Sequence, residues 1–221
     1  MNIKSRFIIA AVFIALLGCN GCDRLYFNAM EKIGIDKRDI MVGRVKDARE
    51  TQDKTKKQFV TAMEQFQSLV NFQGGNLEKE YKKLNATFTK SKTRAEEVRQ
   101  RIRAVENVSA ALFEEWRAEI KQYSNESLRR SSQQKYDVTQ KKYTQLISAM
   151  KKAEAKLEPA LAPLRDQVLF MKHNLNARAI AGLNTEVVKV QANVDQLVKE
   201  MEKAITQADS FINALQVQQQ E

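Results

Sequence analysis

The sequence contains little glycine, proline, cysteine or histidine. Its 221 residues include 7 Gly, 2 Pro, 2 Cys and 1 His. A sandwich of many strands, or a fold in which strands and helices alternate, needs more turn-forming residues than this chain has. A single histidine also excludes a metal site built on several histidines. These scarcities predict an all-α fold.

Aromatic residues are scarce as well, and long apolar runs are absent. Aromatic side chains make up 7% of the chain, whereas 29% of the residues are charged and 43% are hydrophobic. This composition favours long amphipathic helices over disorder, with a narrow hydrophobic seam as the core. The uninterrupted apolar run from Phe7 to Leu17 is 11 residues long. It falls short of the roughly 20 residues with which a helix spans a bilayer.

The first residues are typical of a secretory signal peptide. Lys4 and Arg6 precede the apolar run, which ends in Leu16-Leu17-Gly18-Cys19. This ending resembles the lipobox of bacterial lipoproteins, which implies that Cys19 is acylated and becomes the new N-terminus. We therefore expect residues 1–18 to be a signal peptide and 19–35 to be a lipidated tether with a stub helix. Because Asn20 stands where an Asp would favour inner-membrane retention, the resemblance implies the outer membrane, at its periplasmic face.

The second cysteine, Cys22, completes a CxxC pattern with Cys19. No second cysteine pair and no βαβ context accompany the pattern, so a redox or zinc site is disfavoured. Lipidation of Cys19 leaves Cys22 as a lone thiol near the membrane. Cys22 has no role of its own, is an alternative site of acylation, or forms an intermolecular disulfide in an oxidising periplasm.

Hydrophobic residues repeat in steps of four and three along the rest of the chain. Asp36 is an expected N-cap, and the first helical seam runs from Met41 to Leu69 with polar layers at Gln52 and Thr55. This seam ends before Gly74-Gly75, after which Asn76 caps the next helix. We expect these steps to form coiled-coil-like packing.

The second seam runs without a slip through residues 76–123. It includes Trp116, Glu119 and Tyr123, and we expect Trp116 and Tyr123 to fill the core rather than stack on a ligand. Its weakest point is Asn107 to Ser109, where a helix break is expected if the span is not continuous. Ser124-Asn125 marks the next reversal.

The third helical stripe begins at Leu128 and continues to Pro159. Both prolines, Pro159 and Pro163, fall in otherwise good helix, so we expect a kink or restart at Glu158. Thr185 is expected to open the last helix, which residues 218–221 follow as a frayed tail.

The last helix differs from the others in charge. Residues 184–221 contain 3 basic and 6 acidic side chains, whereas each preceding segment is basic. An acidic helix packs favourably beside basic neighbours, so we predict an elongated antiparallel bundle of about four long helices over residues 36–217. The rival arrangement is an open coiled coil that forms a homodimer through the same seams.

The sequence contains no recognisable catalytic or cofactor-binding motif. HExxH, GxGxxG and GxxxxGK[ST] are all missing. We therefore expect no enzyme activity, no metal and no cofactor other than the lipid on Cys19. The lone His173 is interpreted as a residue on a bundle face, bonded to a backbone or Asn partner, with a pH-sensitive contact as the alternative.

Basic residues suggest an anionic partner. The net charge of +10 becomes +8 once Lys4 and Arg6 are removed with the signal peptide. A nucleic acid is disfavoured because the chain is expected to be exported and the basic residues alternate with Glu. Phospholipid, lipopolysaccharide and peptidoglycan are the better candidates. The residues considered for partner or anion binding are Arg99, Arg103, Arg129, Arg130, Arg165, His173 and Arg178.

Three stretches together resemble a known family. They are Met30 to Ile40, Ser124 to Ser132, and Arg165 to Ala179. In these stretches the chain is similar to a family of uncharacterised lipoproteins of Gram-negative bacteria, filed as a domain of unknown function. The resemblance covers essentially the mature chain and implies lipidation and an all-α fold, but no activity, ligand or catalytic residue.

The expected function is therefore non-enzymatic. We expect a lipid-anchored protein at the periplasmic face of the outer membrane, acting as a structural or adaptor element of the cell envelope. Its expected partners are the membrane, through the anchor, and an envelope protein or anionic envelope polymer. The alternative is a binding module that recognises anionic envelope components through basic helix faces.

Overall fold

A computed structural model describes Phe27, Met30 and residues 36–72, 74–174 and 177–217, without the side chains of 177–185 and Val217. Five helices account for almost all of these residues: α3 (Lys37–Val70), α4 (Leu77–Ile120), α5 (Glu126–Ala155), α6 (Leu157–His173) and α7 (Ala177–Val217). No strand occurs in these ranges. The predicted signal peptide, Cys19, Cys22 and the tail at 218–221 lie outside the described residues.

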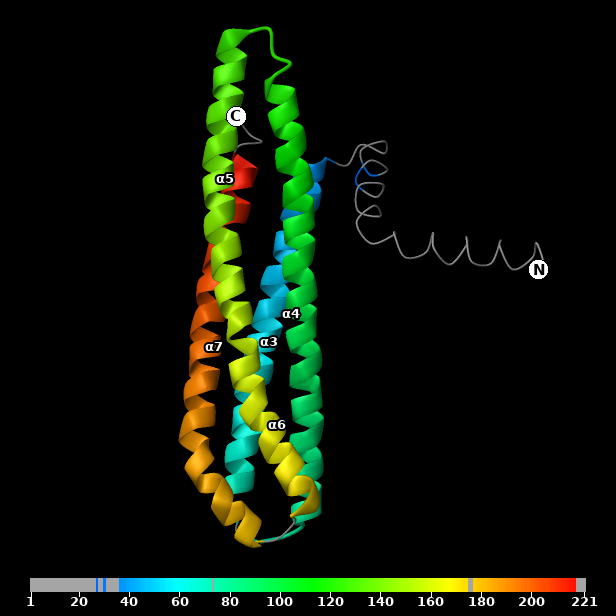
Figure 1. The fold of residues 1–221 in the computed structure, drawn as a ribbon, viewed down its shortest axis with the longest axis vertical. Helices are drawn as coiled ribbons and strands as arrows, with labels where there is room; N and C mark the ends of the chain where they lie inside the picture. The colour runs from blue at the N-terminus through cyan, green and yellow to red at the C-terminus, as the bar shows by residue number, and fades with distance from the viewer. Residues whose placement is uncertain (1–26, 28–29, 31–35, 73, 175–176, 218–221) are drawn as a thin grey trace, which may run out of the picture.

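The helices form one elongated antiparallel bundle (Figure 1). The chain runs down α3, up α4, down α5 and its continuation α6, and up α7. Helix α3 packs mainly against α4 and α7, and α5 packs against α7 and α4, so four legs close around a common core. The predicted all-α bundle of about four long helices is confirmed, with its third leg divided between α5 and α6.

Side-chain caps fix where three of the helices begin. The Asp36 carboxylate accepts a hydrogen bond from the backbone N–H of Arg38 at 2.7 Å. The side chain of Asn76 accepts from Lys79 N–H at 3.0 Å, and that of Asn125 accepts from the N–H groups of Ser127 and Leu128. These bonds satisfy backbone donors that a helix leaves open in its first turn. The predicted caps at Asp36 and Asn76 are confirmed.

The predicted seam of α3 is buried along its whole length. Every step of four and three from Met41 to Leu69 is at most 1% exposed, including the polar residues Gln52 and Thr55. The α7 seam is equally complete from Val190 to Leu215. Since these side chains are buried against helices of the same chain, the seams close without a second copy.

Two helix boundaries differ from the sequence-based expectation. Helix α4 continues through Asn107 to Ser109, because the Ser109 hydroxyl donates to the Glu106 carbonyl at 2.9 Å and stays within the helix. Helix α7 begins at Ala177, eight residues before Thr185, the expected start.

The third leg restarts close to the expected position. Helix α5 ends at Ala155, Lys156 lies between the two helices, and α6 begins at Leu157. Pro159 falls in the first turn of α6, where its missing N–H costs nothing, while Pro163 lies in the interior and leaves one carbonyl of the preceding turn without its helical donor. The predicted restart at Glu158 is confirmed to within one residue.

The seams of α4 and α5 end differently from the prediction. Tyr123 is 42% exposed and Leu128 is 55% exposed, and Glu119 is exposed as well. The expectation that Tyr123 fills the core is wrong, as is the start of the α5 stripe at Leu128. The α4–α5 turn extends beyond the ends of α3 and α7, so no third helix covers these residues (Figure 1).

Candidate functional site

Three of the predicted arginines belong to one ion-pair network between α4 and α6. Glu96 contacts Arg103 at 3.3 Å and Arg99 at 3.4 Å. Arg99 also lies 3.8 Å from Glu158, which in turn pairs with Arg165 at 3.2 Å. The sequence did not predict this juxtaposition, because Arg165 is far from the other two arginines along the chain. The network leaves these three side chains largely neutralised by neighbouring carboxylates.

The same network shifts one pKa. The Arg103 guanidinium hydrogen-bonds to Glu96 and, helped by Arg99, lowers the pKa of the Glu96 carboxyl below its usual 4.5. Glu96 is 50% exposed and water screens its ion pairs. The network therefore orients α6 on α4 more than it stabilises the bundle.

The remaining predicted residues are scattered. Arg129 and Arg130 both pair with Glu126 at the α4–α5 turn, at one end of the bundle. His173 is the last residue of α6 and is exposed at the opposite end. The backbone of Arg178 lies in α7, but its side chain is outside the described residues. The seven predicted residues therefore do not form a single site.

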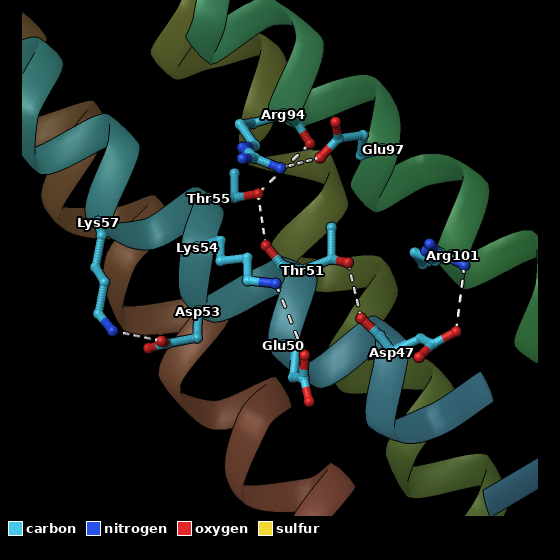
Figure 2. A network of polar contacts seen from close by, with 10 residues as sticks. All are labelled: Asp47, Glu50, Thr51, Asp53, Lys54, Thr55, Lys57, Arg94, Glu97 and Arg101. Carbon is cyan, nitrogen blue, oxygen red and sulfur yellow. Dashed lines mark hydrogen bonds and ion pairs between the residues drawn. The ribbon is translucent and has the colours of Figure 1, made fainter. Parts of the chain in front are cut away.

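Figure 2 shows a polar network where α3 faces α4. Arg101 of α4 reaches Asp47 of α3 at 3.3 Å. The Thr55 hydroxyl donates to the Thr51 carbonyl at 2.7 Å and lies 3.5 Å from the Arg94 carbonyl across the interface. The other contacts drawn, such as Lys57 with Asp53, stay within one helix. These contacts set the register of two helices and are not arranged around a cavity.

The upper part of α4 packs on α5 through aromatic side chains. Trp116 is 7% exposed, its indole N–H donates to the Ser132 hydroxyl at 2.9 Å, and its ring meets that of Tyr136 edge to face at 5.6 Å. Arg117 donates to the Tyr136 hydroxyl, which raises the pKa of Arg117 above its usual value. Trp116 is therefore a core residue, as predicted, and it fixes the α4–α5 hairpin.

The α4–α5 turn combines two of the predicted arginines, Arg129 and Arg130, with exposed apolar side chains that the sequence did not assign to a site. We call residues 121–130, from Lys121 to Arg130, the hairpin tip. Every residue of the tip is exposed. Lys121 forms no ion pair with the described residues, and Arg129 and Arg130 share the single carboxylate of Glu126. The signal available in the sequence was that Tyr123 and Leu128 flank the turn.

The core contains one unsatisfied polar side chain. Gln52 is 0% exposed, and neither its amide oxygen nor its amide nitrogen has a hydrogen-bond partner. Gln58, two turns further along α3, is also buried, but its amide nitrogen lies 3.3 Å from the Ser91 hydroxyl. Gln52 therefore destabilises the bundle relative to an apolar residue of similar size.

A surface hollow of about 270 Å³ lies at the α3–α4 groove. Phe27 is 4% exposed and lines it together with Arg44, Arg103 and Ala104. Phe27 therefore lies against α3 and α4. In the part of the chain that the structure describes, no cluster of three His, Cys, Asp or Glu side chains suits a metal ion. No helix there combines the length and apolar character that spanning a membrane requires.

Comparison with known proteins identifies a family and adds no activity. Residues 26–215 match the family described as "Protein of unknown function (DUF2959)". The chain belongs to this family. The match begins next to Phe27 and ends at Leu215, so it spans the described bundle except for the last two residues of α7. No curated protein matches the chain.

Proposed function

We propose that the protein is a non-enzymatic, lipid-anchored element of the cell envelope that acts as a structural spacer or adaptor. One observation supports this most strongly: a single chain closes a long, narrow bundle whose longest helix, α4, has 44 residues. At 1.5 Å per residue, α4 is about 65 Å long. Such a rod places two distant surfaces in a fixed relation.

The anchor in this proposal is Cys19, at the end of the lipobox-like sequence. An acylated N-terminus holds one part of the rod at a membrane, at the outer membrane's periplasmic face, while the rest projects away from it. The proposal includes no catalytic step and no cofactor beyond the attached lipid. Its partner is an envelope protein or an anionic envelope polymer.

The second candidate function, binding of anionic envelope components, is favoured by a specific observation. The described residues offer no ion-pair partner to Lys135, Lys141 or Lys142 on the upper half of α5. Arg99, Arg103 and Arg165 are instead paired with carboxylates. The α5 leg therefore offers unpaired cations that the α4–α6 network lacks, as do Lys46, Lys90 and Lys92 elsewhere on the described bundle.

Crosslinking in intact cells tests the proposed function. The tagged chain is compared with a Cys19→Ser variant, and the material captured from washed envelopes is identified. The adaptor role predicts recovery of one envelope protein that is lost with Cys19→Ser. Recovery of only lipid, cell wall or the chain itself contradicts the adaptor role and favours anion binding or self-assembly.

A further inference from the structure

We infer that the hairpin tip docks on the surface of a phospholipid membrane that contains anionic headgroups. The inference rests on the proposed envelope location for the source of the membrane, and it deepens that proposal by stating which end of the rod faces the bilayer. It rests on the uncovered apolar residues of the tip, its charge, and the position at which the chain enters the bundle.

The tip exposes apolar groups that continue the internal seams. Tyr123 and Leu128 occupy seam positions of α4 and α5, but α3 begins at the level of Glu115, where Lys37 pairs with it at 3.1 Å. Trp116 and Ile120 are still buried just beyond that level, but the α4–α5 turn itself extends past the ends of α3 and α7 (Figure 1). A tyrosine and a leucine at the end of a rigid hairpin suit a membrane interface, where an amphipathic ring and a short apolar side chain are both stabilised.

The charges around these two residues complement an anionic surface. The tip contains three basic residues, Lys121, Arg129 and Arg130, and one acidic residue, Glu126, which pairs with both arginines. Each basic residue near an anionic membrane surface adds to the attraction, as long as it lies within about 10 Å of the headgroups.

The position of Phe27 allows the tip and the anchor to meet one membrane. Phe27 packs at the level of Ala104, and the 17 positions from Ala104 to Lys121 rise about 25 Å along α4. Eight positions separate Cys19 from Phe27, and an extended chain of that length spans about 27 Å. An acyl group on Cys19 therefore reaches the plane of the tip.

The opposite end of the rod also exposes apolar residues, Leu169 and Phe170 of α6. That end lies at the far side of the bundle from the first residue of α3 (Figure 1). A tether of eight residues beyond Phe27 does not reach it. Leu169 is therefore a matched control, since it is 56% exposed and Leu128 is 55% exposed.

The test uses the chain from residue 19 onward with Cys19→Ser and Cys22→Ser, so that no acyl group contributes to binding. Every described residue lies at or after Phe27, so this chain keeps the whole described bundle. Binding is measured to vesicles of phosphatidylethanolamine with phosphatidylglycerol, and to vesicles of phosphatidylcholine alone. We expect binding to the first and little binding to the second.

Charge reversal at the tip is compared with the same charge change elsewhere. The tip variant combines Lys121→Glu, Arg129→Glu and Arg130→Glu. The control combines Lys46→Glu, Lys90→Glu and Lys92→Glu, three exposed lysines of α3 and α4 without ion pairs in the described structure. We expect the tip variant to bind anionic vesicles about tenfold more weakly or worse, and the control to stay much closer to the parent chain. Equal loss in the two variants overturns the inference.

A fluorophore on Leu128→Cys, compared with one on Leu169→Cys, reports which end touches the lipid. Quenching by brominated lipid at 128 and not at 169 is the expected result. Quenching at 169 alone, or no binding of the parent chain together with a crosslink from 128 to an envelope protein in cells, overturns lipid docking. Because the chain is unacylated, failure of the Cys19 anchor leaves these readouts unchanged.

Discussion

At the residue scale, Gln52 shows that the core was not selected for stability alone. A buried amide without partners costs about 1–3 kcal/mol, and an apolar residue at this seam position removes that cost. A polar residue in a helical seam also disfavours alternative registers and oligomers, which gives a physical reason for its presence. The neighbouring polar layer at Thr55 is satisfied by the Thr51 carbonyl, so the two layers differ in energy.

We predict that Gln52→Leu raises the free energy of unfolding by about 1–3 kcal/mol, because it removes two unsatisfied polar atoms at nearly constant volume. Urea denaturation followed by circular dichroism measures the change. Gln58→Leu is the control: it removes a satisfied side chain, so it leaves stability unchanged or lowers it. A Gln52→Leu protein no more stable than the parent contradicts this reading of the core.

Glu96 makes the free energy of unfolding depend on pH in the acid range. Arg103 and Arg99 lower the pKa of Glu96 in the folded state below 4.5, so its ion pairs stabilise the fold at neutral pH. That contribution is present above the unfolded pKa and is lost as the pH falls through the folded pKa. We predict that the stability difference between the parent and Glu96→Gln shrinks as the pH falls from 7 through 4.5 and below.

The measurement is urea denaturation at several pH values. Glu64→Gln is the matched control, because Glu64 is exposed and has no ion pair in the described structure. If Glu96→Gln changes the free energy of unfolding by the same amount at pH 7 and at the lowest pH measured, the arginine contacts do not stabilise the folded state.

At the element scale, the stability of each helix comes from its seam. Phe66 is 0% exposed in α3, so Phe66→Ala removes a large buried side chain and leaves a cavity. We predict a loss of about 3–5 kcal/mol in the free energy of unfolding. Val60, on the same helix and 41% exposed, changes by at most about 0.5 kcal/mol when replaced with Ala. Similar losses at the two positions mean that α3 is not held by this seam.

The sequence predicted the seams well because burial follows helical periodicity. All nine seam residues from Met41 to Leu69 are buried as predicted, because spacing by four and three residues is enough to identify them. It failed where the outcome depends on a neighbour. Tyr123 and Leu128 fit the periodicity, but they are exposed because α3 and α7 end before them.

The candidate site was less predictable for the same reason. Arg99 and Arg165 meet at Glu158 only because α6 folds back along α4, and no local pattern encodes that contact. The helix start at Ala177 was missed because Thr185 has the side chain of a good N-cap, and the sequence pattern gave no earlier start.

At the scale of the whole molecule, the four legs bury one another's hydrophobic seams within a single chain. Arg49 of α3 pairs with Asp209 of α7 at 2.9 Å, and Lys56 pairs with Glu202 at 3.4 Å, so the acidic last helix lies against a basic neighbour. We predict a monomer by sedimentation at low micromolar concentration, because the seams are already buried. A dimer with no detectable monomer would favour the open coiled coil that pairs through the same seams.

The central claim is that this rod is fixed to a membrane through Cys19. The most direct test is the mass of the N-terminal peptide of the protein isolated from the cells that produce it. The account predicts that this peptide begins at Cys19 and carries the mass of attached acyl chains, and that Cys19→Ser leaves the protein unacylated. A peptide that begins at Met1, or at an unmodified residue after another cleavage site, would contradict the account.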